Sequence, residues 1–224
     1  MWIKWINCRV LPGGREDFAD AQREWAAIAD QPGLVGQVGG WEAGGERAHV
    51  LGVWAGEEAY TAFMAVRHDE IVTAASAERS GRRDGEGPEP GSWQVTSVTT
   101  GASVLDIPGE AAGLDDALAR GTALRVADCH LHPGRAEHFL DAQRRVWNPA
   151  MATAGGMLAG AVTRLADDRY LVATLWTGAD AHQRYAERDV AALRARAGVA
   201  ADVRALTGLA LPLEADWQVL PGLG

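Results

Sequence analysis

The chain has few of the features that mark secreted or membrane proteins. It has only two cysteines in 224 residues, too few for a disulfide framework. No apolar run approaches the roughly 20 residues of a membrane-spanning helix, so no membrane partner is expected. The first residues do not combine a basic region with an apolar stretch. We therefore expect no signal peptide and a cytoplasmic protein.

An excess of positive charge is also absent. The formal net charge is -9, whereas the phosphates of DNA and RNA require a basic surface. Nucleic acid is therefore not an expected partner. The 47% hydrophobic and 23% charged residues are ordinary for a globular protein.

Phenylalanine and tyrosine are scarce, with three of each, but the chain has nine tryptophans. An indole ring offers a flat apolar surface and one N–H donor, which suits a pocket for a planar ligand. The alternative is that most of these rings belong to the core.

The chain contains a long internal repeat. Asp20-Ala21-Gln22-Arg23 recurs as Asp141-Ala142-Gln143-Arg144, and the residues before each copy match at the same spacings: Cys8, Pro12, Gly13 and Phe18 against Cys129, Pro133, Gly134 and Phe139. The period is about half the chain, longer than the ~20–50 residues of a solenoid repeat. The repeat predicts a duplicated domain, hence a pseudo-dimer within one chain. Further association of chains stays open.

Hydrophobic periodicity predicts the same order of elements in both copies. In the first copy we expect strands at 2–10, 34–42, 47–54 and 93–100, helices at 15–29 and 56–77, and a loop at 80–91. In the second copy we expect strands at 124–131, 157–165, 170–176 and 216–220, and helices at 135–153 and 179–197. The segment between the copies begins at Pro108-Gly109 and is expected to be helical.

This order, β-α-β-β-α-β, is that of a ferredoxin-like unit, an antiparallel four-stranded sheet with both helices on one face. The second copy would cover the free face of the first sheet. The predicted fold class is α+β, with tandem ferredoxin-like repeats forming an intramolecular dimeric α/β barrel. The predicted domains are 1–107 and a diverged 122–224, joined by a linker at 108–121.

Two segments carry a family resemblance. Gly33-Leu34-Val35-Gly36-Gln37-Val38-Gly39-Gly40-Trp41, with the opening Trp2-Ile3-Lys4-Trp5-Ile6, resembles the YdbC-like family of uncharacterised bacterial proteins. More broadly, the chain resembles the dimeric α/β-barrel superfamily, which includes antibiotic-biosynthesis and haem-degrading monooxygenases. The resemblance implies the fold. It does not imply one activity, because this superfamily also contains dismutases, isomerases and binding proteins.

The resemblance disfavours haem binding or degradation. Haem-degrading relatives carry an asparagine on the first strand, which Asn7 matches. The tryptophan and histidine that they carry on the second helix fall on Phe63 and Thr73.

The resemblance instead implies a cofactor-independent monooxygenase, which deprotonates a small anthrone- or quinol-like substrate that then reacts with O2. Such a site needs a base, amide donors for the oxyanion and an aromatic cage. We expect His68 and Asn7 to be catalytic, with no cofactor and no metal. The residues expected to bind the substrate are Trp5, Gln22, Trp25, Gln37, Trp41, Trp54 and Phe63.

Other interpretations remain open. His68 could be a surface residue of its helix, and Asn7 a strand residue satisfied by backbone. The protein could be a non-catalytic binder of a planar hydrophobic molecule, or a structural domain whose pocket is filled by side chains. Gly36, Gly39 and Gly40 indicate close approach of a helix or a ligand to their strand.

Comparison of the copies favours a site in the first copy. His68 aligns with Val190, Asn7 with Asp128 and Gln37 with Gly160. The second copy has its own cluster, with Asp128, His130 and His132 alternating on one strand and His138 following. Because the first three span about 13 Å, they cannot all bind one ion. Two of them could, but we expect no metal site.

Overall fold

The computed structural model describes residues 1–71, 73 and 92–222. By their contacts, these residues form two compact units. Unit 1 is Met1–Thr100 with Glu214–Gly224, and unit 2 is Gly101–Leu213. The loop predicted at 80–91 and the end of the helix predicted to reach residue 77 lie outside the described residues. None of the described helices combines the length and apolar character needed to span a membrane.

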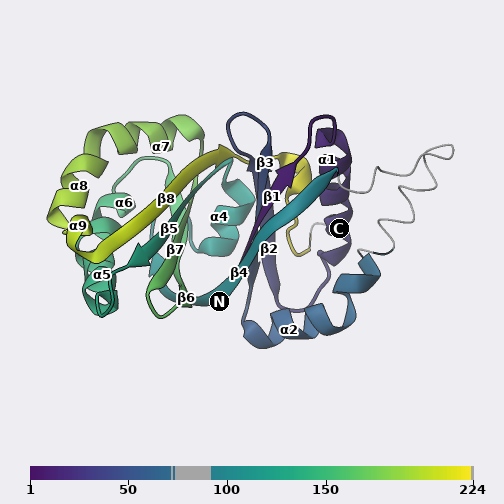
Figure 1. Cartoon of the computed structure of the whole chain (residues 1–224), viewed down its shortest axis with the longest axis horizontal. Helices are drawn as coiled ribbons and strands as arrows, with labels where there is room; N and C mark the ends of the chain where they lie inside the picture. Colours follow the sequence, from purple (N-terminus) through teal and green to yellow (C-terminus); the bar gives the residue numbers. More distant parts are fainter. Residues whose placement is uncertain (72, 74–91, 223–224) are drawn as a thin grey trace. The chain divides into compact units, whose positions relative to one another are not determined.

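Unit 1 has one helix-covered sheet with the strand order β2-β3-β1-β4 (Figure 1). Its elements are β1 (Trp2–Val10), α1 (Arg15–Arg23), the 3₁₀-helix η1 (Glu24–Ile28), β2 (Leu34–Trp41), β3 (Arg47–Trp54), α2 (Glu57–Val66), the beginning of β4 (Trp93–Ile107) and the 3₁₀-helix η4 (Ala215–Trp217).

Alternation along β1 determines which side chains face the helices of unit 1. β1 pairs with β3 without a shift, from Trp2 opposite Trp54 to Arg9 opposite Arg47. Because successive residues of a strand point to opposite faces, the set containing Cys8 packs against helix α1. Asn7 therefore lies on the other face.

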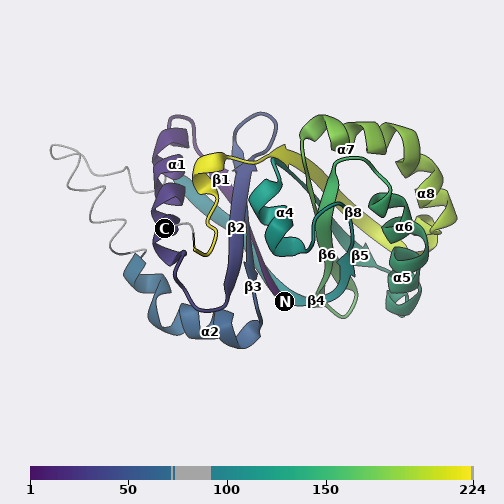
Figure 2. The same ribbon diagram turned by 180° about the vertical axis from the view of Figure 1, so that it is seen from behind.

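Unit 2 repeats this arrangement, with the order β4-β6-β7-β5-β8. Helices α5 to α9 lie on one face of its sheet and α4 lies on the other (Figures 1 and 2). Its elements are the end of β4, α4 (Leu114–Arg120), β5 (Ala123–Leu131), α5 (Ala136–Ala142), the π-helix η2 (Gln143–Trp147), α6 (Asn148–Ala152), β6 (Met157–Ala166), β7 (Arg169–Trp176), α7 (Ala179–Tyr185), the π-helix η3 (Ala186–Val190), α8 (Ala191–Arg196), α9 (Val199–Asp202) and β8 (Val203–Pro212).

The predicted fold class is confirmed. In each unit the fourth strand pairs beside the first and the second lies at the opposite side, as in a ferredoxin-like sheet. The segment predicted to be a helical linker contains α4. The domain boundaries 1–107 and 122–224 stay a prediction. They were inferred from the repeated sequence, whereas the compact units are defined by contacts between residues.

The prediction of a closing strand at 216–220 was wrong. The fourth strand of unit 2 is β8, Val203–Pro212, which pairs with β5. Trp217 lies instead in η4, and Val219 makes an isolated bridge with Gln37. Trp217-Gln218-Val219 resembles Trp93-Gln94-Val95, which lies in a strand, so the sequence predicted a strand. A segment with strand propensity forms a strand only where a neighbouring strand is available for backbone pairing.

The segment that carries Trp217 explains a glycine of β2. Trp217 is buried against Phe18 and Trp41, with ring centroids 5.4 and 5.2 Å away. A Cβ on Gly39 would lie 2.7 Å from the His49 carbonyl oxygen and 3.0 Å from the Trp217 ring. The close approach predicted here is therefore made by a 3₁₀-helix of the chain itself.

We predict that Gly39→Ala lowers the free energy of unfolding by about 1–3 kcal/mol, because the added methyl must displace backbone or a buried indole. Gly155→Ala is the matched control, since a Cβ there meets nothing within 4 Å, and it should change stability by less than about 0.5 kcal/mol. Urea unfolding measures both. Equal stability of the two variants would contradict this packing.

Candidate functional site

The helix-covered face of the unit 1 sheet holds a cavity of about 430 Å³. Six of the nine predicted site residues line it: Gln22, Trp25, Gln37, Trp54, Phe63 and His68. Pockets for small organic ligands are roughly 300–1,000 Å³. The interpretation in which side chains fill the pocket is therefore not supported.

Aromatic rings form one wall of this cavity. Trp54 stacks on Phe63 with centroids 4.8 Å apart and planes at 26°. Trp25 meets Phe63 edge-on at 6.5 Å. Trp54 and Phe63 are buried, whereas Trp25 is partly exposed. The fixed rings provide a flat apolar surface against which a planar ligand can stack.

Gln37 presents an unused hydrogen-bond donor to the cavity. Its backbone N–H donates to the Val219 carbonyl and its carbonyl accepts from the Val219 N–H, at 2.8 and 2.9 Å. Its side chain is buried, and Nε2 has no partner among the described residues. A buried donor left unpaired costs about 1–3 kcal/mol. A ligand oxygen is the kind of group that would remove this cost.

Lys4, the only lysine of the chain, also lines the cavity. Its Nζ lies 3.8 Å from Met64 Sδ and 5.6 Å from the centre of the Tyr60 ring. The described residues give it no carboxylate, and burial lowers the pKa of its amine. The sequence analysis did not predict Lys4, because it assigned the site to the face of the strand that carries Asn7. Alternation along residues 2–10 places Lys4 on the opposite face, which is the face that lines the cavity.

His68 lies beside the aromatic wall, with its ring centroid 5.7 Å from that of Trp25. Its side chain is 24% exposed, and Nδ1 is 2.9 Å from the Asp69 carboxylate. A carboxylate on one ring nitrogen orients the other nitrogen for proton transfer. The His68 imidazole is thus in contact with both solvent and the cavity, and its role as a base stays a prediction.

Asn7 and Trp5 are not among the residues that line this cavity. Asn7 Oδ1 is 2.7 Å from His49 Nδ1, and Asn7 Nδ2 donates to Ser97 Oγ at 2.6 Å. Trp5 stacks on the His49 ring at 5.2 Å. Burial lowers the pKa of His49, and the hydrogen bond that His49 makes to the Glu42 carboxylate opposes this shift. The roles predicted for Asn7 and Trp5 stay predictions.

Trp41 lies on the helix-covered face but outside the cavity lining. It packs with Phe18 and Trp217. The Arg15 guanidinium lies 4.1 Å from the centre of its ring, a cation–π contact. These contacts support the core, and substrate binding by Trp41 likewise stays a prediction.

Unit 2 has a cavity of about 400 Å³ at the equivalent position. Cys129, Gln143 and Trp176 line it as Cys8, Gln22 and Trp54 line the first. The copies differ around the tryptophan. In unit 2, Thr174 Oγ1 accepts a hydrogen bond from Trp176 Nε1–H at 2.9 Å. In unit 1 the residue two positions before Trp54 is Gly52, which has no side chain to accept one. The expectation that the first copy holds the active site stays a prediction.

The acidic and histidine residues noted on β5 form other pairs. Asp128 accepts two hydrogen bonds from Arg169, at 3.0 and 2.6 Å. His130 Nε2 lies 3.6 Å from Asp128, and His138 pairs with Asp202. Within the described residues, no three His, Cys, Asp or Glu side chains are grouped as metal ligands.

We predict that both thiols react slowly with Ellman's reagent in the folded protein. Cys8 and Cys129 are free and buried, and burial raises the pKa of each to about 11. Because only the thiolate reacts, both should react at least tenfold faster in 6 M guanidinium chloride at pH 8. Cys8→Ala and Cys129→Ala assign the two signals. A thiol that reacts equally fast before and after unfolding would contradict its burial.

Residues 2–83 match a family described as a domain of unknown function, DUF4937. Over 74 residues the chain is 38% identical to the uncharacterised protein YdbC of Bacillus subtilis (strain 168). The match covers 32% of this chain and 62% of that protein, so it spans less than two thirds of this relative's length.

Solved structures match over almost the whole chain. A protein of Lactobacillus acidophilus NCFM, assigned provisionally as a monooxygenase, has a TM-score of 0.66 at 13% identity, covering 99% of this chain and 97% of that one. An anthrone oxidase-like protein has a TM-score of 0.64 at 14% identity, covering 99% and 94%. Identities this low show the fold alone. The expected resemblance is confirmed: the fold is that of the dimeric α/β-barrel proteins, residues 2–83 match the domain of unknown function DUF4937, and 74 residues are similar to YdbC.

Proposed function

We propose that the unit 1 cavity is the active site of a cofactor-independent monooxygenase that oxidises a small anthrone- or quinol-like molecule with O2. The observation that carries the proposal is the combination of a histidine, an unpaired amide donor and a partly buried cation around one flat aromatic wall. The structural likeness to an anthrone oxidase-like protein supports the substrate class.

In the first step of the proposed reaction, the substrate stacks against Trp54 and Phe63 and His68 removes a proton from it. The negative charge develops on the substrate oxygen, which accepts a hydrogen bond from Gln37 Nε2. Lys4, when protonated, stabilises the same charge. Electrostatic stabilisation of this kind is strong in a cavity that excludes water.

The second step uses O2 as the only oxidant. For an anthrone, O2 bonds to the deprotonated methylene carbon and gives a substrate hydroperoxide. Loss of water leaves a carbonyl on that carbon, so one oxygen atom enters the product and the other leaves as water with both methylene hydrogens. Atoms and electrons balance without a further reductant.

A binding protein for a planar hydrophobic molecule is the second candidate. The stacked Trp54 and Phe63 rings and the cavity volume favour a binding protein as much as they favour a monooxygenase. A binding protein needs the aromatic wall but not the base. The two candidates differ in what removal of His68 does.

We predict that the purified, metal-stripped protein consumes O2 with anthrones or dihydroxynaphthalenes, and that His68→Ala and Gln37→Leu each lower the rate at least tenfold, about 1.4 kcal/mol of barrier. An oxygen electrode measures the rate. His130→Ala is the matched control, because His130 belongs to unit 2 and lines neither cavity, and its rate should match that of the unsubstituted protein.

Uptake that survives His68→Ala would contradict the role of His68. No uptake, with tryptophan fluorescence still quenched by the same compounds, would favour the binding protein. The absence of both signals would overturn both candidates.

A further inference from the structure

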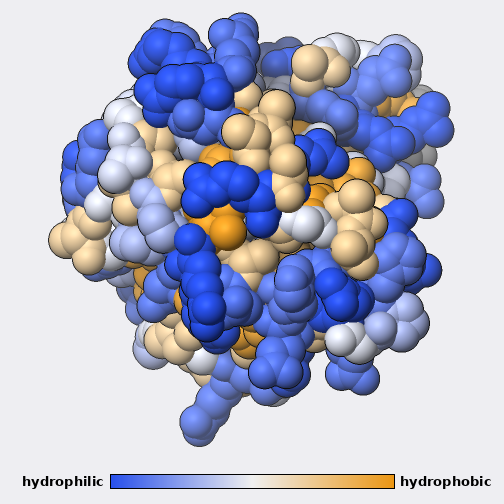
Figure 3. Space-filling view, turned by 90° about the vertical axis from the view of Figure 1, so that its left-hand side faces the viewer, coloured by the Kyte–Doolittle hydropathy of each residue, from blue (hydrophilic) through white to orange (hydrophobic). Residues whose placement is uncertain are grey.

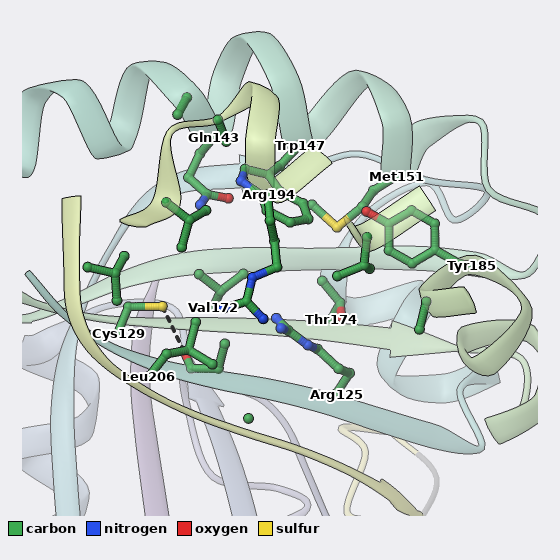
Figure 4. A pocket seen from close by; sticks show the side chains of 18 of the residues that line it. Arg125, Cys129, Gln143, Trp147, Met151, Val172, Thr174, Tyr185, Arg194 and Leu206 are labelled. Atoms are coloured by element: carbon green, nitrogen blue, oxygen red, sulfur yellow. Dashed lines mark hydrogen bonds between the residues drawn. The ribbon is translucent and has the colours of Figure 1, made fainter. Parts of the chain in front are cut away.

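The unit 2 cavity differs from the unit 1 cavity in charge. Arg125 on β5 points its guanidinium into the cavity, and Arg194 reaches in from α8 (Figure 4). Figure 4 shows the two guanidinium groups directed toward one another between the strands and the helices. Like charges so placed repel each other unless an anion lies between them.

Among the described residues, neither arginine has a partner that neutralises it. Within the part of the chain that the structure describes, no hydrogen bond or ion pair engages Arg125 or Arg194. Asp202 is the only carboxylate among the cavity-lining residues. One of its oxygens accepts from Arg135, with contacts of 2.6 and 2.8 Å, and the other lies 2.6 Å from His138 Nδ1. Burial and the nearby Arg194 lower the pKa of Arg125.

Tyr185 adds an unused polar group. Its side chain is buried beside the Trp176 ring, with centroids 5.3 Å apart, and its hydroxyl has no partner among the described residues. Burial raises the pKa of this hydroxyl to about 12, so at neutral pH it is a donor. The cavity thus offers two cations, of which Arg194 is exposed, and a neutral donor, and the described residues give none of the three a hydrogen-bond partner.

The remaining walls suit a flat apolar body. Trp147, Trp176, Met151 and Val172 line the cavity. Gln143 and Trp147 lie on the π-helix η2, and the π-helix η3 contributes to the lining on the facing helix. π-helical turns are rare and frequently occur at functional sites. Two of them at one cavity are a second, independent indication that it binds a ligand.

The cavity reaches the surface beside β8. Leu206 lines it and is 39% exposed. A neighbouring groove shares Arg194 and Leu206 with the cavity. The side of the molecule that carries α8 and α9 in Figure 1 shows hydrophobic residues exposed among hydrophilic ones (Figure 3). A small molecule can therefore enter with its apolar part between β8 and α8.

We propose that the unit 2 cavity binds a small planar organic carboxylate, with the carboxylate between Arg125 and Arg194 and the ring system against Trp147 and Trp176. A guanidinium matches a carboxylate with two parallel hydrogen bonds. Inorganic phosphate would satisfy the arginines but leave the apolar walls uncovered. A neutral aromatic molecule would cover the walls but leave the charges unpaired. The volume of about 400 Å³ accommodates a fused two-ring acid.

The test compares 2-naphthoate with its uncharged methyl ester by isothermal titration calorimetry on the full chain. We expect 2-naphthoate to bind at least tenfold more tightly than methyl 2-naphthoate, and Arg125→Met to lose at least tenfold in affinity for 2-naphthoate. Arg184→Met is the matched control. It removes the same charge as Arg125→Met, but Arg184 is exposed on α7 and lies outside the cavity lining. It should bind within twofold of the unsubstituted protein.

The thermal midpoint separates loss of binding from loss of folding. Without ligand, Arg125→Met should unfold at a higher temperature, because it removes an unpaired charge from an apolar cavity. 2-Naphthoate should raise the midpoint of the unsubstituted protein and leave that of Arg125→Met unchanged.

Lys4→Met distinguishes the two cavities and should leave 2-naphthoate binding within twofold. Equal affinity for acid and ester, undiminished binding by Arg125→Met, binding lost in Lys4→Met, or no binding at all would each overturn the proposal. The comparison of acid with ester on the unsubstituted protein keeps the test decisive if Arg125→Met does not fold.

Discussion

Both candidate sites depend on one feature: in each unit, the first strand carries a cationic side chain that lines an apolar cavity. Lys4 in unit 1 and Arg125 in unit 2 occupy equivalent positions of the repeat, and burial lowers the pKa of both. A charge in an apolar cavity is stable only when hydrogen bonds or an opposite charge compensate it. Within the described residues neither Lys4 nor Arg125 forms an ion pair, although Glu24 lines the first cavity and Asp202 the second. We therefore expect each cation to favour an anionic ligand.

Duplication allowed the two cavities to diverge around this shared feature. Unit 1 surrounds its cation with a stacked aromatic wall, the unpaired Gln37 amide and His68, which suits a substrate that becomes an anion during a reaction. Unit 2 adds a second cation, Arg194, and has Val190 where unit 1 has His68. That arrangement suits a ligand that is already an anion. If both proposals hold, one fold presents a reactive site and a binding site in one chain.

Hydrophobic periodicity was enough to predict most of the fold, because the same pattern occurs in both copies of the repeat and each copy supports the assignment of the other. Alternation located the β1 and β5 strands, and helical spacing located the helices. The fourth strand of unit 2 was missed because β8 is mostly exposed and has weak alternation, while Trp217 depends on distant partners. The cavity cations were missed for a related reason. Which face of a strand the helices cover is a tertiary property, and the choice of Asn7 over Lys4 assumed the other face.

The most direct test of this account is the pKa of Lys4, measured by NMR on protein labelled with ¹³Cε-lysine. Since Lys4 is the only lysine, one resonance reports it without assignment. The account predicts a pKa below the ordinary 10.5 that rises when an anionic aromatic ligand enters the unit 1 cavity. A pKa at or above 10.5 in the free protein would mean that the amine is hydrated or paired. The claim that the cavity holds an uncompensated cation would then be wrong.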